Sequence, residues 1–343
     1  MSSFPPAGRS VTNDPNVLPI LHSIVHADHI LKVIQEHWDF PKPHFCELIA
    51  RGMNDNYLLR AGDTQYAVRF YNARGRTPDE IDYEADYLDY IEDEGKLPMS
   101  RVIRTRDGRS HVPVQAPEGT RYVSMFNWAK GRELVEVLDA KYAYRLGELM
   151  GRLHVVSPGY KGGNRRLLGH ADSIRKNFPF LEKRVLHRPD DLAFYRKVYE
   201  ILPDQLDKMD KVVPMGPTHG DMTVFNVFEH QGELILMDFE TCGYGHFSHE
   251  LGSFCWSAHK NRFAPEVTEN YLAGYDSVRP RDKVEKDLLP MARLMKDFTQ
   301  LVGVSRGINA IGYSAYKFKG FDWAIDSCRT HVANAKLFDK PLG

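Results

Sequence analysis

The chain has 343 residues, enough for one large domain or two lobes, and its 42% hydrophobic and 27% charged residues are the balance of an ordinary globular protein. Its formal net charge of −1 excludes a nucleic-acid surface built on bulk positive charge. No apolar stretch approaches the ~20 residues that a membrane helix requires, so we expect no membrane partner.

The first predicted elements are an irregular arm and a helix. Residues 1 to about 22 are rich in Pro, Ser and Asn and lack the apolar core of a secretory signal. The stretch HADHILKVIQEHWDF then places Ile30, Ile34 and Trp38 at helical spacing, and the two prolines that follow it end the helix. We assign residues 1–43 to this N-terminal arm and helix.

A small lobe is predicted next, over residues 44–127. The runs FCELIA, NYLLRA and QYAVRFY predict strands, and the turn-forming stretches RGMNDN and AGDT between them indicate an antiparallel meander. The stretch TPDEIDYEADYLDYIEDEG is typical of a helix that starts with a capping box of Thr77 and Glu80 and stops at Gly95. Two further strands are predicted around SRVIRT and RYVSMFN.

From residue 128 to residue 343 the pattern is mainly helical. One stretch, PTHGDMTVFNVFEHQGELILMDFETC at 217–242, is the strand-rich exception. The predicted fold class is therefore α+β, with a small antiparallel-sheet lobe that carries one main helix and a larger helical lobe. The long helices are predicted at 139–156, 172–187, 190–210, 264–277, 284–309 and 322–337.

The strand-rich exception predicts a β-hairpin whose strands flank the turn HQGE. In an antiparallel hairpin the residue that enters the first strand faces the residue that leaves the second. Asn226 and Asp238 are therefore expected side by side at the open end. Asp221 can reach the same place from a short loop, and Glu240 can lean in from two residues beyond Asp238.

One carboxamide oxygen and one or two carboxylates form a hard-oxygen site, which suits Mg²⁺ shared with substrate phosphates. We expect Asn226, Asp238 and Glu240 to supply these oxygens. Asp221, as a further carboxylate that does not bind the metal, can accept a proton from an incoming hydroxyl. Phosphoryl transfer requires a metal ion, a general base and groups that position the reactants.

The spacing HGDMTVFN followed by MDFE resembles the protein-kinase pattern His-Arg-Asp-x4-Asn with Asp-Phe-Gly. It is closer to the aminoglycoside phosphotransferase and choline kinase superfamily, and the resemblance covers most of the chain from about residue 44. It implies a two-lobed protein-kinase-like fold, ATP as phosphate donor, Mg²⁺ as cofactor and a small-molecule hydroxyl as acceptor. By motif, Asp221 is the catalytic base, Asn226 and Asp238 bind magnesium, and Glu240 matches the second acid of choline kinases.

The resemblance also implies ATP-binding residues in the first half of the chain. RGMNDNYLL lies where the superfamily has its phosphate-covering turn, which makes Asn54 and Asn56 candidates. RYVSMFNWAKGRELVE resembles the hinge between the lobes. Backbone groups near Met125 to Asn127 are then expected to receive the adenine.

Arg69 in YAVRFY matches the strand cation that contacts the α- and β-phosphates, a position where the superfamily usually has Lys. Its alternative role is that of an ordinary solvent-facing Arg. Glu84 is the preferred partner of Arg69, because a capping role already accounts for Glu80, the competing acid.

The acceptor site is predicted in the helical lobe, with His219, Glu250, Trp256 and Trp323 as candidates. Aromatic side chains at this density can form a cage for an ammonium group, although core packing explains them equally well. Glu250 in SHELGSF also matches the Asp that braces the catalytic loop in relatives. The acceptors considered are an amino alcohol such as choline, a hydroxy amino acid such as homoserine, and an amino-bearing antibiotic.

Other functions stay open at this stage. A protein Ser/Thr kinase of the same fold is one, and a non-catalytic nucleotide-binding module is another, although such a module would be expected to lack one of the three motif residues. The 15 histidines prompt a metal-dependent hydrolase. That alternative lacks an i, i+4 histidine pair and gives no role to Arg69 with Glu84.

Four widely spaced cysteines have neither zinc-ligand nor redox spacing, and they fit free thiols in a reducing compartment. We therefore expect a cytoplasmic protein. Its expected partners are ATP and a small-molecule acceptor, without a nucleic acid or a membrane. The cysteines are Cys46, Cys242, Cys255 and Cys328.

Overall fold

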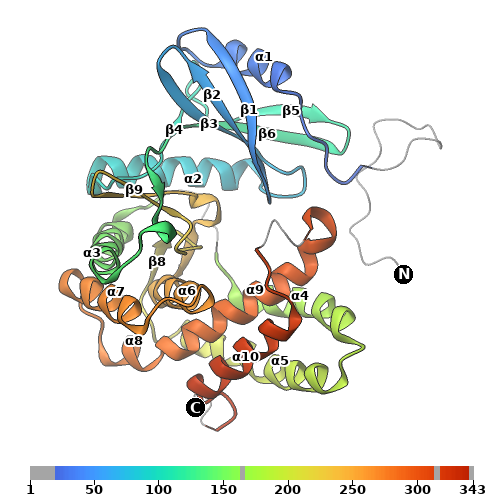
Figure 1. Ribbon diagram of the computed structural model, residues 1–343, viewed down its shortest axis with the longest axis vertical. Coiled ribbons are helices and arrows are strands. Elements are labelled where there is room, and N and C mark those ends of the chain that lie inside the picture. The colour runs from blue at the N-terminus through green and yellow to red at the C-terminus, as the bar shows by residue number, and fades with distance from the viewer. Residues whose placement is uncertain (1–19, 163–166, 313–316, 340–343) are drawn as a thin grey trace. The chain divides into compact units, whose positions relative to one another are not determined.

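The computed structural model describes residues 20–162, 167–312 and 317–339 (Figure 1). These residues fall into two units, which we describe separately. Nearly all of the expected N-terminal arm lies outside the described residues. The first unit contains residues 20–89, 100–128 and 310–312, and the second contains residues 90–99, 129–309 and 317–339.

The first unit is built on an antiparallel sheet with strand order β1-β2-β3-β6-β4, in which β5 also pairs with β6. The predicted meander is confirmed as β1 to β3. The sequence did not predict β5, because Pro113 interrupts its short apolar pattern; an edge strand tolerates such a proline. The strands are β1 Pro43–Arg51, β2 Asp55–Ala61, β3 Thr64–Phe70, β4 Val102–Ile103, β5 Val112–Ala116 and β6 Gly119–Asn127.

Two helices, α1 (Ala27–His37) and α2 (Pro78–Tyr90), belong to this unit. Ile30 and Ile34 of α1 are fully buried in one core cluster with Val68 of β3. Arg69, the next residue of β3, pairs with α2 instead. Because successive side chains of a strand point to opposite faces, α1 and α2 cover opposite faces of the sheet.

The start of α2 is the predicted capping box, and the helical segment that begins with α2 ends at the predicted residue. The backbone N–H of Glu80 donates to Thr77 Oγ1 at 3.3 Å, and the N–H of Thr77 donates to Glu80 Oε2 at 3.0 Å. After α2 the helical segment continues as a π-helical turn (η1, Ile91–Gly95), so it ends at Gly95 as predicted. The residue that caps it in the left-handed conformation is Lys96, with φ 47°.

The second unit contains the remaining helices, and most of them match the predicted ones. The expected helix over 284–309 is two helices, because Pro290 lacks an N–H and clashes with the preceding turn of a continuous helix. We did not predict α6, which is buried almost all round. The helices are α3 Ala140–Val156, α4 His170–Val185, α5 Pro189–Met209, α6 Phe247–Lys260, α7 Pro265–Val278, α8 Lys283–Asp287, α9 Leu289–Ile311 and α10 Phe321–Ala335.

Short strands of the second unit form two small sheets. One has the order β10-β9-β7 and the other pairs β11 with β8. The predicted hairpin is confirmed as β9 and β10, and its turn residues Gln231 and Gly232 both have positive φ, as a tight hairpin turn requires. The strands are β7 Arg132–Glu133, β8 Met215–Thr218, β9 Val227–His230, β10 Glu233–Leu236 and β11 Gly243–His246.

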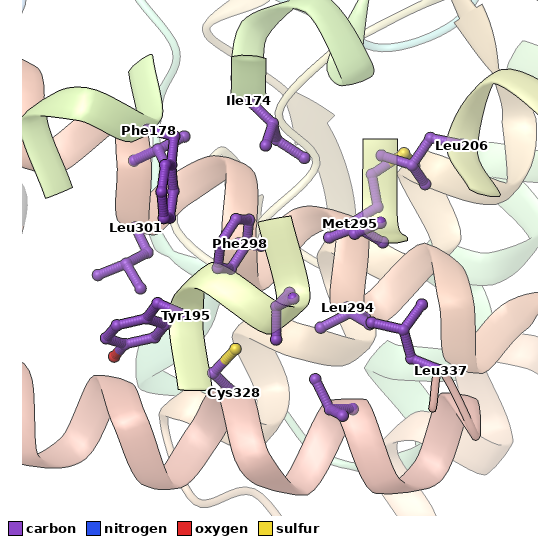
Figure 2. Packing of buried hydrophobic residues seen from close by; sticks show 14 of the residues in the cluster. Ile174, Phe178, Tyr195, Leu206, Leu294, Met295, Phe298, Leu301, Cys328 and Leu337 are labelled. Carbon is purple, nitrogen blue, oxygen red and sulfur yellow. The ribbon is translucent and has the colours of Figure 1, made fainter. Parts of the chain in front are cut away.

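The main core of the second unit is formed by α4, α5, α9 and α10 (Figure 2). Phe298 of α9 is fully buried, and its ring centroid lies 6.2 Å from those of both Phe178 and Tyr195. This packing fixes α9, which also carries Lys296 to the loop of residues 219–221. No helix in the described part of the chain is long and apolar enough to span a bilayer.

Candidate active site

The loop of residues 219–221 follows β8 and is braced by Glu250 of α6. Glu250 is fully buried, and its two carboxylate oxygens accept the backbone N–H groups of His219 (2.8 Å) and Gly220 (2.9 Å). Burial alone would raise the pKa of Glu250, but nearby His154 and His219 lower it below its usual value. The longer Glu thus reaches both N–H groups, and this geometry favours bracing over contact with an acceptor.

Gly220 is the position in this loop that requires glycine. Its φ is 87°, in the region that side chains with a Cβ rarely adopt. A Cβ here would lie 2.0 Å from the carbonyl oxygen of Thr241. The missing side chain therefore lets the loop pack against the backbone that follows Asp238.

His219 connects the loop to the end of β10. Its Nε2 lies 2.6 Å from the carbonyl oxygen of Met237, so Nε2 carries the proton and donates it. Nδ1 then accepts the backbone N–H of Asp221 at 3.3 Å, and the ring packs on Phe239 with 4.3 Å between centroids. Both ring nitrogens of this buried residue are engaged within the protein, which favours a positioning role over acceptor binding.

Asp221 is held by two neighbours and still has 37% of its side chain exposed. Lys296 Nζ lies 2.5 Å from Oδ1, and Asn226 Nδ2 lies 2.7 Å from the backbone oxygen and 3.3 Å from Oδ2. Burial would raise the pKa of Asp221, but the charge and hydrogen bond of Lys296 outweigh it, and the pKa is lowered. Asp221 is therefore ionised and accessible.

The candidate metal ligands lie at the open end of the hairpin. The backbone N–H of Met237 donates to the carbonyl of Asn226 at 2.9 Å, so Asn226 faces Met237, one residue before Asp238. Asp238 is exposed and adopts the left-handed conformation with φ 60°, and Glu240 is half-buried in the 3-10 turn η4 (Phe239–Thr241). The Nδ2 atom of Asn226 faces Asp221, so the other terminal atom of its side chain, Oδ1, is the one that can bind a cation.

This donor set fits magnesium, which prefers oxygen ligands and is shared with substrate phosphates. Within the described ranges, no group of three or more His, Cys, Asp or Glu side chains could hold a metal by itself. A hydrolase centre built on converging histidines and carboxylates is therefore not supported by the described residues.

Lys296 of α9 is the site residue that the sequence analysis missed. It is buried, and the next residue, Asp297, accepts a hydrogen bond from Trp256 Nε1 at 2.6 Å. The available signal was the pair of adjacent charges within the apolar run LMKDF, because buried charges are rare without a specific partner.

The two tryptophans proposed for the acceptor lie together. Trp256 is only 4% exposed, and its ring meets that of Trp323 edge-on, with 6.3 Å between centroids. Lys296 Nζ lies 5.8 Å from the Trp256 ring centroid, which connects this aromatic pair to Asp221. Trp323 packs, partly buried, against the core of α4, α5, α9 and α10.

In the first unit, the ion pair preferred from the sequence is present. Arg69 Nη1 donates to Glu84 Oε1 at 2.9 Å, and both residues are buried. Tyr71 donates to the other carboxylate oxygen at 3.1 Å, and the Arg69 guanidinium lies 4.7 Å from the Phe126 ring centroid. Arg69 is therefore not an ordinary solvent-facing residue.

The other proposed ATP-binding residues lie in or beside the sheet. Asn54 is buried and its Oδ1 accepts a backbone N–H at 3.1 Å, while Asn56 faces Arg69 across β2 and β3. Met125 is fully buried within β6, and the backbone N–H of Asn127 donates to Arg101 at 3.0 Å. The backbone groups at this end of β6 are already hydrogen-bonded within the sheet. The first backbone groups outside the sheet are those of residues 128–130.

Comparison with known proteins gives a family and a fold. The profile of the phosphotransferase enzyme family (APH) matches residues 46–285. An uncharacterized protein of Synechocystis sp. is 26% identical over 288 residues, which are 80% of this chain and 76% of that protein. A homoserine kinase of Gluconobacter oxydans is 25% identical over 261 residues, 71% of this chain and 76% of that protein.

Among solved structures, the amicoumacin kinase hAmiN in complex with AMP-PNP, Ca²⁺ and Ami superposes with a TM-score of 0.69. The match has 18% sequence identity and covers 90% of this chain and 93% of that chain. It confirms the α+β, protein-kinase-like fold predicted from the sequence.

Proposed function

This chain belongs to the phosphotransferase enzyme family and is a small-molecule kinase, and on that premise we propose that it transfers the γ-phosphate of ATP to a hydroxyl group of its substrate. The observation that carries the proposal is Asp221. It is ionised, 37% exposed, and fixed by Lys296 and Asn226. Such a carboxylate can orient an incoming hydroxyl and take up its proton.

The residues at the open end of the hairpin supply a metal site, which phosphoryl transfer requires in addition to a base. Asn226, Asp238 and Glu240 would hold Mg²⁺ through their oxygens. When bound, Mg²⁺ neutralises charge on the phosphates of ATP. His219 and Glu250 keep the loop of Asp221 in place, because their hydrogen bonds fix its backbone and the end of β10.

The first unit would bind the rest of ATP. Arg69 contacts the α- and β-phosphates and Glu84 holds its guanidinium in place, while the turn with Asn54 and Asn56 covers the phosphates. The adenine hydrogen bonds then come from backbone groups just after Asn127, because the backbone of β6 is already used by the sheet.

The acceptor would be a hydroxyl-bearing small molecule, for which the amino alcohols, hydroxy amino acids and amino-bearing antibiotics are the candidates. A homoserine kinase and an amicoumacin kinase among the similar proteins support a small acceptor. ADP release that requires both Mg²⁺ and an added hydroxyl compound tests the proposal. ADP release that is independent of any acceptor would contradict it.

Glu84→Ala is expected to raise KM for ATP by about tenfold, because loss of a buried partner lets the Arg69 side chain swing away from the phosphates. Glu80→Ala is the matched control. It removes an acid of the same helix whose hydrogen bond is local to the capping box. Equal and small effects of the two variants on ATP affinity would show that the Arg69–Glu84 pair has no part in binding ATP.

Lys296→Met is expected to move the acidic limb of the kcat–pH profile to higher pH. Without the ammonium group, the burial of Asp221 is no longer outweighed, so its pKa rises. In the native protein the lowered pKa contributes stability that is complete above the unfolded-state value of about 4 and is lost as pH falls through the folded-state value. An unchanged acidic limb in Lys296→Met would contradict this positioning role.

A further inference from the structure

Four lysines surround the aromatic residues near Asp221, and we call Lys260, Lys296, Lys317 and Lys319 the lysine cluster. Lys260 Nζ lies 5.1 Å and Lys296 Nζ 5.8 Å from the ring centroid of Trp256. The other two ammonium groups also face rings: Lys319 lies 5.6 Å from Trp323, and Lys317 lies 3.7 Å from Phe225. The cluster thus gathers residues from α6, from α9 and from the segment before α10.

The lysine cluster has more positive charge than its surroundings balance. Lys296 pairs with Asp221, but in the described ranges no carboxylate lies within ion-pair distance of Lys260, Lys317 or Lys319. Lys319 donates to a backbone carbonyl, that of Lys260. A cation cluster of this kind attracts an anion, because its like charges repel one another and the charge of the buried Lys260 is costly to leave uncompensated.

Lys260 shows the imbalance most clearly. The residue is only 8% exposed, although its side chain ends in an ammonium group. Burial first, and then the charges of Lys319 and Lys296, lower the pKa of Lys260 to about 8. A bound anion beside Lys260 would restore the charged form and offset the repulsion from its neighbours.

The same arrangement argues against an aromatic cage for an ammonium ligand. The Trp256 ring already faces two ammonium groups of the protein, and its Nε1 donates to Asp297. The ring of Trp323 faces Lys319. A choline-like cation placed here would meet the lysine cluster at close range and would be repelled.

We infer that the acceptor carries an anionic group, a carboxylate or a phosphate, next to the hydroxyl that receives the γ-phosphate. This inference rests on the proposed function and narrows its substrate class to hydroxy acids, hydroxy amino acids or phosphorylated alcohols. The base takes its proton from the acceptor, and Lys296 lies 2.5 Å from that base. The lysine cluster therefore lies beside the residue that receives the proton of the acceptor. The phosphates of ATP are also anions, and the test below separates the two.

The test measures the melting temperature of the full chain with saturating Mg²⁺ and AMP-PNP, so that all nucleotide phosphates are already bound. Inorganic phosphate is then added and compared with NaCl of equal ionic strength. We expect phosphate to stabilise the protein beyond the salt control. Lys260→Met and the exposed Lys317→Met should each need about tenfold more phosphate for the same stabilisation, since a charge-assisted hydrogen bond is lost.

Lys283→Met is the matched control, because Lys283 is an exposed lysine of α8 that pairs with Asp287. It should respond to phosphate as the native protein does. Stabilisation no larger than that by NaCl, or equally weakened in Lys283→Met, would overturn the inference. A phosphate effect seen only without AMP-PNP would also overturn it, by assigning the lysine cluster to the γ-phosphate. Failure of Mg²⁺ and AMP-PNP themselves to stabilise the protein would instead count against the proposed function.

Discussion

Asp221→Asn lowers the rate of phosphoryl transfer by about 10²-fold or more, the usual scale for a general base, while ATP and Mg²⁺ bind nearly as well as before. The Asn side chain keeps the size of Asp and can still hydrogen-bond to Asn226. It cannot take up the proton of the acceptor hydroxyl. Nucleotide affinity and ADP release measured on one preparation test this expectation, and undiminished transfer by a stable variant with normal ATP affinity would refute the base assignment.

The contact between Asp221 and Lys296 adds a structural effect that must be separated from catalysis. Asp221→Asn leaves the buried Lys296 ammonium without its carboxylate, so the melting temperature should fall. The double variant Asp221→Asn with Lys296→Met removes both charges and should regain stability. If it regained transfer as well, Asp221 would be a structural residue and not the base.

Asp238→Asn is expected to reduce turnover at limiting Mg²⁺ by about 10²-fold, because a neutral oxygen holds magnesium poorly. The fold should survive, since Asp238 has φ 60° and Asn is among the residues that tolerate this conformation best. The stabilisation of the protein by ATP should also lose its dependence on Mg²⁺. This second readout does not depend on activity.

Glu233→Gln is the control for Asp238→Asn, because Glu233 is an exposed acid on β10, the strand that leads to Asp238. It removes the same charge without touching the open end of the hairpin. Both variants are titrated with Mg²⁺ in the same ADP-release assay. Unchanged turnover of Asp238→Asn at limiting Mg²⁺, or an equal loss in Glu233→Gln, would contradict the metal-ligand assignment.

The features that were predicted best from the sequence depend on residues that lie close together along the chain. The hairpin follows from a Gly-containing turn between two short apolar runs, and its register puts Asn226 and Asp238 at the same end. The capping box of Thr77 and Glu80 is equally local. Arg69 could be paired with Glu84 by elimination, because the cap already used the competing acid.

The features that the sequence did not predict depend on packing between distant segments. Lys296 lies 75 residues from Asp221, and only the packing of α9 brings the two together. Glu250 was ambiguous, because the reach of its side chain to two backbone N–H groups depends on where α6 lies. The hinge near Met125 to Asn127 stays a prediction, and the pairing of β6 with β3 and β4, which uses this backbone, cannot be read from β6 itself.

The most direct test of the central claim follows the γ-phosphate itself in a single turnover with γ-labelled ATP, Mg²⁺ and a panel of hydroxyl compounds. We expect the label to leave ATP and appear in a phosphomonoester of one acceptor, in equal amount to the ADP formed. Asp221→Asn, with its nucleotide affinity intact, should leave the label on ATP over the same time. Label found only as inorganic phosphate, or transferred at the native rate by Asp221→Asn, would contradict a kinase that uses this site.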